Sequence, residues 1–226
     1  MNKNPVEIID DLNNKFLSNI VEWKSIDHSL VTKSFLLARA ISEIGQILSL
    51  SSLSKHRLNC CGIFDEIFSD TISAVYLATC SIDNPAKIVL RRVVEMGVSA
   101  MYLWDMPHTY YGWELLGEDL SFSEMIAHLN SAGYRQYVAV ETGKQIENEI
   151  ILVKIKDHYG TLSDVVHGRI TFFTSKLPDR FTFNAIKWNT FIEMTNDILL
   201  ILFNAYCVRF NIKDKVIKNI PALTKI

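Results

Sequence analysis

Glycine and proline are scarce in this chain. Nine glycines and five prolines make up about 6% of its 226 residues, against roughly 12% in an average protein. A β-sandwich or β-propeller needs a turn about every 8–12 residues and uses more of both. The low content argues against these all-β folds and favours a helix-rich one.

Cysteine is also scarce, and its spacing does not fit a zinc site. The four cysteines form no C-x-x-C pair and stand at no zinc-like distance from a histidine: Cys60, Cys61, Cys80 and Cys207. We therefore expect reduced core thiols in a cytoplasmic protein. Glycine-rich phosphate loops, the G-x-S-x-G serine motif and H-E-x-x-H are missing too, so we expect no metal and no other cofactor.

Neither sign of charge is in clear excess. Lys plus Arg numbers 23 and Asp plus Glu 25, which gives a formal net charge of −2. This balance argues against a protein that is held on nucleic acid mainly by its overall charge. A local basic patch remains compatible with it.

The chain also lacks a segment with the pattern of a signal peptide or a membrane span. Residues 1–20 contain three acidic residues and no apolar run of seven or more. The most apolar run, 198–203, lies between Asp197 and Arg209, whereas a spanning helix needs about 20 mostly apolar residues. We expect this run to be part of a buried core helix and the protein to have no membrane partner.

What the chain does contain is apolar residues at helical spacing. They make up 49% of the sequence, enough to bury a sizeable core. The spacing predicts helices over about 5–23, 28–50, 57–81, 86–106, 121–131, 145–159, from 161 onward and 184–211. We expect an all-α bundle of about seven or eight helices in one domain over 1–226. Within it, a helical pair (1–56) packs on a core (57–226), and 172–183 forms a small β-hairpin or an ordered loop.

Several helix ends carry recognisable signals. Asn84 suits an N-cap and Pro85 a first helical position, and Pro107 stops the same helix. The aromatic stretch 108–119 that follows is expected to be irregular. Gly160 is expected to cap the 145–159 helix, with Thr161 opening the next one.

The 86–106 helix carries the first candidate site. It is apolar nearly all round, which places it in the centre of the fold. At about 100° per residue its polar residues fall in one narrow stripe: Arg91, Arg92, Glu95, Ser99 and Tyr102. Either arginine can pair with Glu95. The stripe faces either water, as an ordinary solvated face, or a partly buried polar site.

The second candidate is the segment 159–169, YGTLSDVVHGR. Ser163 and Asp164 precede His167 by four and three residues, at the rim of an apolar helix face. A hydroxyl or carboxylate beside a histidine fixes its tautomer and tunes its pKa, which is the minimum for acid–base chemistry. A structural histidine that bridges two helices gives the same pattern, so both interpretations stay open.

Together, Leu90-Arg-Arg-x-x-Glu95 and Tyr159-Gly-x-Leu-Ser-x-x-x-His167-Gly168 resemble a broad bacterial family of uncharacterised all-helical proteins. Its members carry an Arg…Glu pair on a central helix and a Tyr-x-x-Leu-Ser-x-x-x-His segment after it. The similarity covers about residues 63–210. Some members occur beside phage-defence genes, and the family has no settled activity.

More distantly, the helical plan resembles the HEPN superfamily. Its active members are metal-independent ribonucleases of toxin and defence systems, with an arginine, four to six residues and a histidine on one helix, paired across a dimer. None of the six histidines here follows an arginine at that spacing. The resemblance implies a homodimer, and either the catalytic groups are redistributed or the chain does not cut RNA.

Three hypotheses follow. The first is a HEPN-like, RNA-directed effector of a bacterial defence or toxin system, a ribonuclease acting on RNA or a nucleotide. In it, Arg92 binds phosphate, Glu95 orients Arg92, and His167 is the acid or base. The second is a non-catalytic helical module that binds a protein partner from the same operon or a nucleotide signal. The third is a small-molecule enzyme whose pocket lies between the central 86–106 helix and the His167 segment.

The three hypotheses share one geometric expectation. Arg92, Glu95 and His167 should lie within about one side chain's reach of one another. The candidate binding residues around them are Arg91, Tyr159, Ser163, Asp164 and Arg169.

Overall fold

The computed structural model describes residues 4–169 and 179–225, and most of these residues are helical. They form ten α-helices, two short 3-10 helices and no strand: α1 (Pro5–Trp23), α2 (Ser29–Ser49), α3 (Lys55–Thr79), α4 (Asp83–Asp105), α5 (Pro107–Leu116), α6 (Phe122–Leu129), α7 (Ala132–Thr142), α8 (Lys154–Val166), η2 (Asp179–Phe181), α9 (Ala185–Phe210), α10 (Lys213–Asn219) and η3 (Pro221–Lys225). The predicted all-α fold is confirmed, with more helices than the seven or eight expected.

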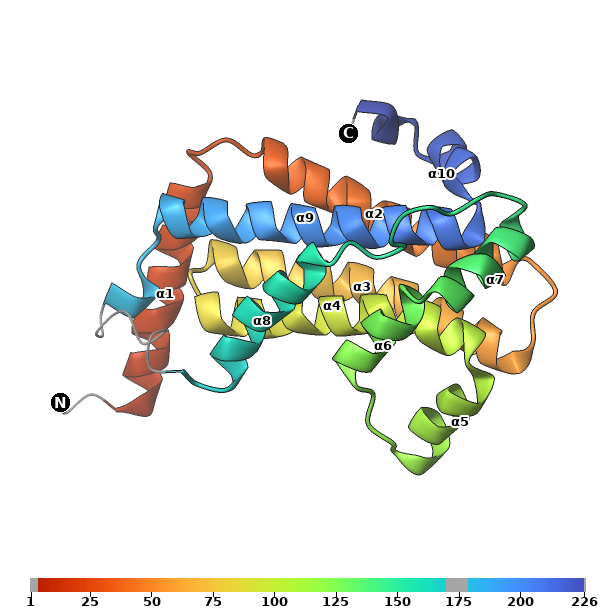
Figure 1. The fold of residues 1–226 in the computed structure, drawn as a ribbon. Helices are drawn as coiled ribbons and strands as arrows, with labels where there is room; N and C mark the ends of the chain where they lie inside the picture. The colour runs from red at the N-terminus through yellow and green to blue at the C-terminus, as the bar shows by residue number, and fades with distance from the viewer. Residues whose placement is uncertain (1–3, 170–178, 226) are drawn as a thin grey trace.

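Four long helices, α2, α3, α4 and α9, lie side by side in the centre (Figure 1). Short loops join α2 to α3 and α3 to α4, so these neighbours run antiparallel. A Cβ at Gly45 of α2 would lie 2.7 Å from the Cβ of Phe64 and 2.9 Å from the carbonyl oxygen of Cys61. Only glycine therefore allows α2 to pack this closely on α3.

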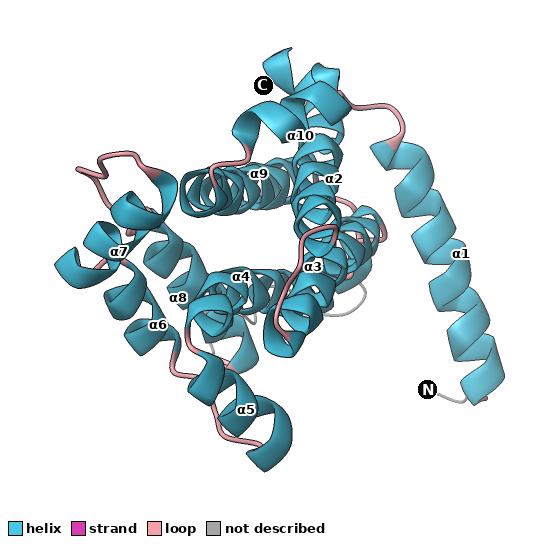
Figure 2. Ribbon diagram, turned by 90° about the vertical axis from the view of Figure 1, so that its right-hand side faces the viewer, coloured by secondary structure: helices cyan, strands magenta, loops and turns pink. Residues whose placement is uncertain are grey.

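Smaller helices cover this centre. α8 crosses α4 and also contacts α9, α6 packs on α4, and α7 packs on α9. α1 lies at the side of the bundle and stands away from it along most of its length (Figure 2). Its residues Val6, Leu17 and Val21 stay 62–68% exposed. The two helices of the 1–56 pair thus differ: α2 belongs to the core, whereas α1 lies against its edge.

α9 contains the apolar run 198–203 that the sequence places in a core helix. By length and composition alone it could cross a membrane, and 67% of its most apolar 18-residue window is buried inside the structure. Ile198, Leu199 and Leu202 have no exposed surface. The prediction of a buried core helix is confirmed.

Two predicted helix boundaries around α4 and α5 are wrong. α4 begins at Asp83, ahead of the proposed N-cap Asn84, because the preceding turn is closed by Ser81 in the left-handed region (φ 60°). Residues 108–119, expected to be irregular, instead form most of α5. Pro107 does end α4, but it also occupies the first position of α5, and Gly117 (φ 69°) caps the end of that helix.

α8 differs most from the prediction. Residues 145–153 are not helical, and α8 runs from Lys154 through Gly160 to Val166. Gly160 does not have a positive φ, and nothing lies within 4 Å of the place its Cβ would take. The helix continues through it because a buried face on both sides packs on the core: Ile155, Leu162 and Val165. Tyr159 and Ser163 therefore lie one turn apart on the same helix.

The hairpin or ordered loop predicted over 172–183 lies largely outside the described residues. The structure describes only 179–183 of this range, and Asp179–Phe181 form the 3-10 helix η2. The hairpin stays a prediction.

The four cysteines lie where the sequence places them. All are free and buried. Burial raises the pKa of Cys60 to about 12, and burial likewise raises the pKa of Cys207 to about 12. At neutral pH these thiols are protonated core residues rather than nucleophiles.

Candidate functional site

α4 and α8 bring the two sequence motifs into contact. Arg91 and Glu95 lie one turn apart on α4 and form an ion pair of 2.9 Å. Tyr159 of α8 completes the group: its hydroxyl accepts a hydrogen bond from Arg91 Nη2 at 2.8 Å and donates one to Glu95 Oε1 at 3.1 Å. A guanidinium, a carboxylate and a phenol from two distant stretches of the chain thus share one site.

The ring of Tyr159 is itself held in place. The Arg91 guanidinium carbon lies 5.0 Å from the ring centroid, within the range of a cation–π contact. Phe122, the first residue of α6, stacks on the same ring with centroids 3.9 Å apart and planes 14° apart. Three helices therefore fix the orientation of this group.

The cluster is only partly covered by protein. The Arg91 side chain is 20% exposed and that of Glu95 37%. Two neighbouring polar atoms, Arg91 Nε and Ser163 Oγ, are buried without a hydrogen-bond partner among the described residues. Buried polar groups are nearly always bonded to protein or water. The α4–α8 contact therefore has unused hydrogen-bonding capacity at an arginine that is mostly buried.

Arg92 does not join this group, so the predicted pairing of Glu95 with Arg92 is not the one formed. Its Nη2 contacts Glu66 at 3.0 Å and its Nη1 contacts Asp70, and both carboxylates belong to α3. Consecutive residues on a helix point about 100° apart. Since α4 packs between α8 and α3, Arg91 faces α8 and Arg92 faces α3.

The electrostatics of the Arg92 group fit a link between helices. The hydrogen bond to Glu66 raises the pKa of Arg92, which outweighs the effect of burial. Burial raises the pKa of Asp70, although the charge of Arg92 opposes it. Because two carboxylates already compensate its charge, Arg92 is poorly suited to bind a phosphate group.

His167 is exposed and lies just beyond α8, where its backbone N–H donates to the Ser163 carbonyl at 2.9 Å. Asp164, expected to tune this imidazole, instead pairs with Arg169 Nε at 2.9 Å. The backbone N–H of Arg169 also donates to the Asp164 carbonyl, so the chain folds back after the helix. Among the described residues, no hydrogen bond or ion pair joins the His167 side chain to Arg92 or Glu95.

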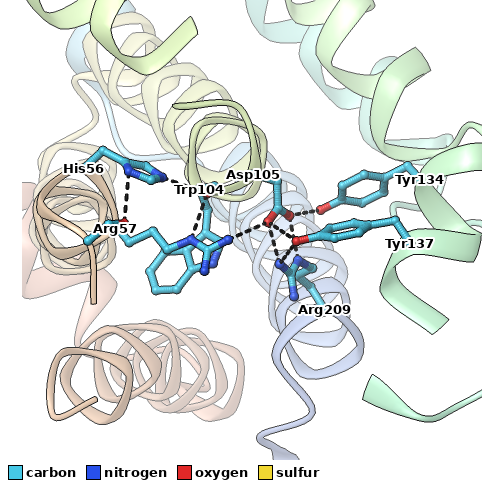
Figure 3. Close-up of polar contacts among 8 residues, drawn as sticks. His56, Arg57, Trp104, Asp105, Tyr134, Tyr137 and Arg209 are labelled. Atoms are coloured by element: carbon cyan, nitrogen blue, oxygen red, sulfur yellow. Dashed lines mark hydrogen bonds and ion pairs between the residues drawn. The ribbon is translucent and has the colours of Figure 1, made fainter. Parts of the chain in front are cut away.

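A second polar centre, missed by the sequence reasoning, surrounds Asp105 at the end of α4 (Figure 3). Arg209 of α9 binds this carboxylate through two hydrogen bonds, from Nε at 2.6 Å and from Nη2 at 2.5 Å. Tyr134 and Tyr137 of α7 add hydrogen bonds of 2.7 and 3.1 Å. Arg57 of α3 lies 3.7 Å away. Four helices meet at this one carboxylate.

This centre is buried. The side chains of Arg209 and Asp105 are 6% and 4% exposed. Burial alone would lower the pKa of Arg209, but the hydrogen bonds and charge of Asp105 leave it raised. Burial, and then the charge of Asp105, raise the pKa of Tyr134. Because both oxygens of Asp105 accept hydrogen bonds from other helices, this carboxylate holds the helices together.

The sequence does contain a signal for this centre. Asp105 and Arg209 are the only charged residues in the last two turns of α4 and α9, among apolar neighbours, and such charges must be paired when buried. Which of the chain's 48 charged residues pair depends on how the helices are arranged. The sequence alone does not give that arrangement.

Comparison of the chain with protein-family models, with curated proteins and with solved structures finds no match. The family resemblance of the two motifs therefore stays a prediction. Function is therefore inferred from the geometry of the site. Within the described part of the chain, no three His, Cys, Asp or Glu side chains gather as a metal site would require.

Proposed function

We propose that the chain is a non-catalytic helical module that binds a partner protein through the surface formed by α4 and α8. We call this surface the α4–α8 face and define it by Ile88, Arg91 and Glu95 of α4 with Tyr159, Ser163 and Val166 of α8. The observation that carries the proposal is the fixed Arg91, which is held by Glu95 and Tyr159 and keeps 20% of its side chain exposed.

The first support is chemical. Acid–base catalysis requires an acid or base within hydrogen-bond distance of the reacting group, next to the residue that stabilises charge. The described residues place Arg92 on α3 carboxylates and leave His167 without a polar partner for its side chain. Arg91 is close to a carboxylate and a phenol, which orient it. This arrangement suits recognition better than proton transfer.

The second support is electrostatic. Along the α4–α8 face and its α3 border the charged groups nearly cancel, with three arginines against four carboxylates: Arg91, Arg92 and Arg169, and Glu66, Asp70, Glu95 and Asp164. A polyanion such as RNA gains little from such a surface, because phosphate neutralisation dominates its affinity. A protein surface with its own mixed charges fits it better.

The third support is the apolar surface next to the cluster. Ile88, three residues before Arg91, is 47% exposed, and Val166, three residues after Ser163, is 40% exposed. Tyrosine and arginine bordered by apolar side chains are enriched at the centres of protein interfaces. The partner is expected to offer an acceptor to Arg91 and apolar contacts to these two residues.

A second candidate is the HEPN-like ribonuclease of a defence or toxin system. One observation favours it: His167 is exposed at the end of α8, the helix that also carries Tyr159. A phosphodiester bound between Arg91 and the end of α8 would then meet an acid or base.

Site-specific photo-crosslinking tests the proposal. A benzophenone amino acid is placed at Ile88, with Tyr76, 61% exposed on α3, as the control position. We expect a discrete adduct from position 88 only. A mass increase of 25.8 kDa identifies a second copy of the chain, and any other increase identifies a different protein.

Two results contradict the proposal. One is the lack of a discrete adduct at position 88 in cells that express the folded protein. The other is cleavage of a mixed RNA substrate by the purified protein that is lost in His167→Ala. That result would establish the ribonuclease instead.

A further inference from the structure

A cavity of about 690 Å³ lies at the other flank of α8, between the start of α4 and the start of α9. Thr161, Lys87 and Lys187 line it, together with Phe16 of α1 and Arg180 of η2. Pockets that bind small molecules have volumes of about 300–1,000 Å³. This cavity has the size of a ligand site, and none of its residues belongs to the α4–α8 face.

The walls of the cavity are mainly apolar and aromatic. Phe16 and Phe181 meet edge to face with ring centroids 5.8 Å apart. Phe191, 5% exposed, is the most deeply buried ring among the lining residues. Small-molecule pockets combine apolar walls of this kind with a few polar groups that orient the ligand.

The charged groups of the cavity are mostly positive. Among the described residues, the charged side chains that line it are Lys87, Arg180 and Lys187 and the carboxylate of Asp83. Lys187 Nζ lies 3.9 Å from Asp83 Oδ2. Burial raises the pKa of Asp83, and the charges of Lys187 and Lys87 oppose this. Among the described lining residues, Arg180 and Lys187 outnumber the carboxylate of Asp83.

Two of the cations lie toward solvent and one of the rings lies toward the core. Arg180 and Lys187 are exposed, whereas Phe191 is buried. α4 and α9 also start at this cavity, and the partial positive charge at each helix start adds to the field of the cations. An anionic group at the mouth and an apolar body in the interior match this distribution.

We propose that this cavity binds a small amphipathic anion, a molecule with an aromatic or aliphatic body and one phosphate or carboxylate group. The body packs against Phe16, Phe181 and Phe191, and the anionic group is bound by Arg180 and Lys187. Inorganic phosphate alone would leave the apolar walls hydrated, and a polynucleotide is too large for the cavity.

The test uses the full chain and the fluorescent anion 1-anilinonaphthalene-8-sulfonate, whose naphthalene ring and sulfonate match the proposed chemistry. We expect saturable binding to one site. Arg180→Ala and Lys187→Met should each weaken binding about tenfold, because charge-assisted hydrogen bonds are the strong ones. Lys215→Ala on α10 removes an equal charge elsewhere and should leave binding unchanged.

Two further variants separate this site from general surface binding. Asp83→Asn removes the one carboxylate and should tighten binding, and Thr190→Trp places an indole in the cavity and should abolish it. Equal affinity in wild type, Arg180→Ala and Asp83→Asn, with circular dichroism showing all three folded, overturns the proposal. So does unchanged binding in Thr190→Trp.

Competition then identifies the natural chemistry. Decanoate carries a carboxylate on an aliphatic body, and adenosine monophosphate carries a phosphate on an aromatic one. Displacement of the probe by either supports the proposal and shows which anionic group the cavity prefers. Displacement by neither overturns it.

Discussion

At the scale of single residues, the structure separates two neighbouring arginines that the sequence treats as equivalent. Arg91 is held by Glu95 and Tyr159, whereas Arg92 is held by Glu66 and Asp70. The same contrast appears around Asp105, where Arg209 is bidentate and buried and Arg57 is more distant and 34% exposed. Burial and geometry decide what an arginine contributes.

The Asp105 centre gives a prediction about stability. Arg209→Met removes the main partner of a buried carboxylate and is expected to cost about 3–5 kcal/mol of unfolding free energy. Arg57→Met removes a partly exposed, distant charge and should cost less than about 1 kcal/mol. Urea unfolding of the two variants beside wild type measures both values. Equal losses would show that Asp105 does not depend on Arg209.

His158 gives a prediction about pH. Its Nε2 is buried, 3.6 Å from Asp197 Oδ2, an oxygen that Lys154 already binds at 2.5 Å. Burial lowers the pKa of His158 below its ordinary 6.5; the charge of Asp197 opposes this, and that of Lys154 adds to it. The unfolded chain therefore takes up this proton first as pH falls. The contribution to stability is complete above about pH 6.5 and is lost below it.

His158→Gln should accordingly lose less stability than wild type between about pH 7 and pH 5. Urea midpoints measured across this range test the difference. Parallel decline in the two proteins would mean that other groups set the acid sensitivity.

The residues of the candidate site were predictable in part. Helical spacing correctly indicates that an arginine of α4 pairs with Glu95, and the distant Tyr159 segment does meet that pair. Spacing does not tell which arginine faces which neighbour, because that depends on where α3 and α8 pack. It also gives no sign that Asp164 turns to Arg169 instead of His167.

At the scale of elements, local signals predict some helix boundaries correctly and miss others. Asn4 accepts hydrogen bonds from the backbone of Val6 and Glu7 at the start of α1, as Pro5 in the first turn leads one to expect. Gly160 carries the signal of a helix end, yet α8 passes through it. Packing of the buried face of α8 on the core outweighs the preference of one glycine.

Gly160 tests this interpretation of α8 against a matched glycine. Gly160→Ala replaces glycine at an exposed position of α8, where nothing lies within 4 Å of the added Cβ. It should stabilise the protein by about 0.5–1 kcal/mol. Gly143→Ala, at the left-handed end of α7 (φ 67°), should destabilise it. Thermal unfolding compares the two, and destabilisation by Gly160→Ala would contradict a continuous α8.

At the scale of the whole molecule, two candidate sites lie on opposite flanks of α8, next to the four central helices. One flank of α8 meets α4 in the Arg91 cluster, and the other borders the cationic cavity between α4 and α9. Composition and apolar spacing suffice to predict the all-α fold. The position of α8 across α4 and α9 arises from long-range packing, so the location of neither site could be predicted from the sequence alone.

The most direct test of the account is the photo-crosslink from position 88, compared in Arg91→Met and Arg92→Met. Arg91→Met is expected to reduce the adduct at least about tenfold, because Arg91 belongs to the α4–α8 face whereas Arg92 is bound to carboxylates of α3. Arg92→Met should leave the adduct near its wild-type yield. Loss of the adduct in Arg92→Met with full yield in Arg91→Met would contradict the account.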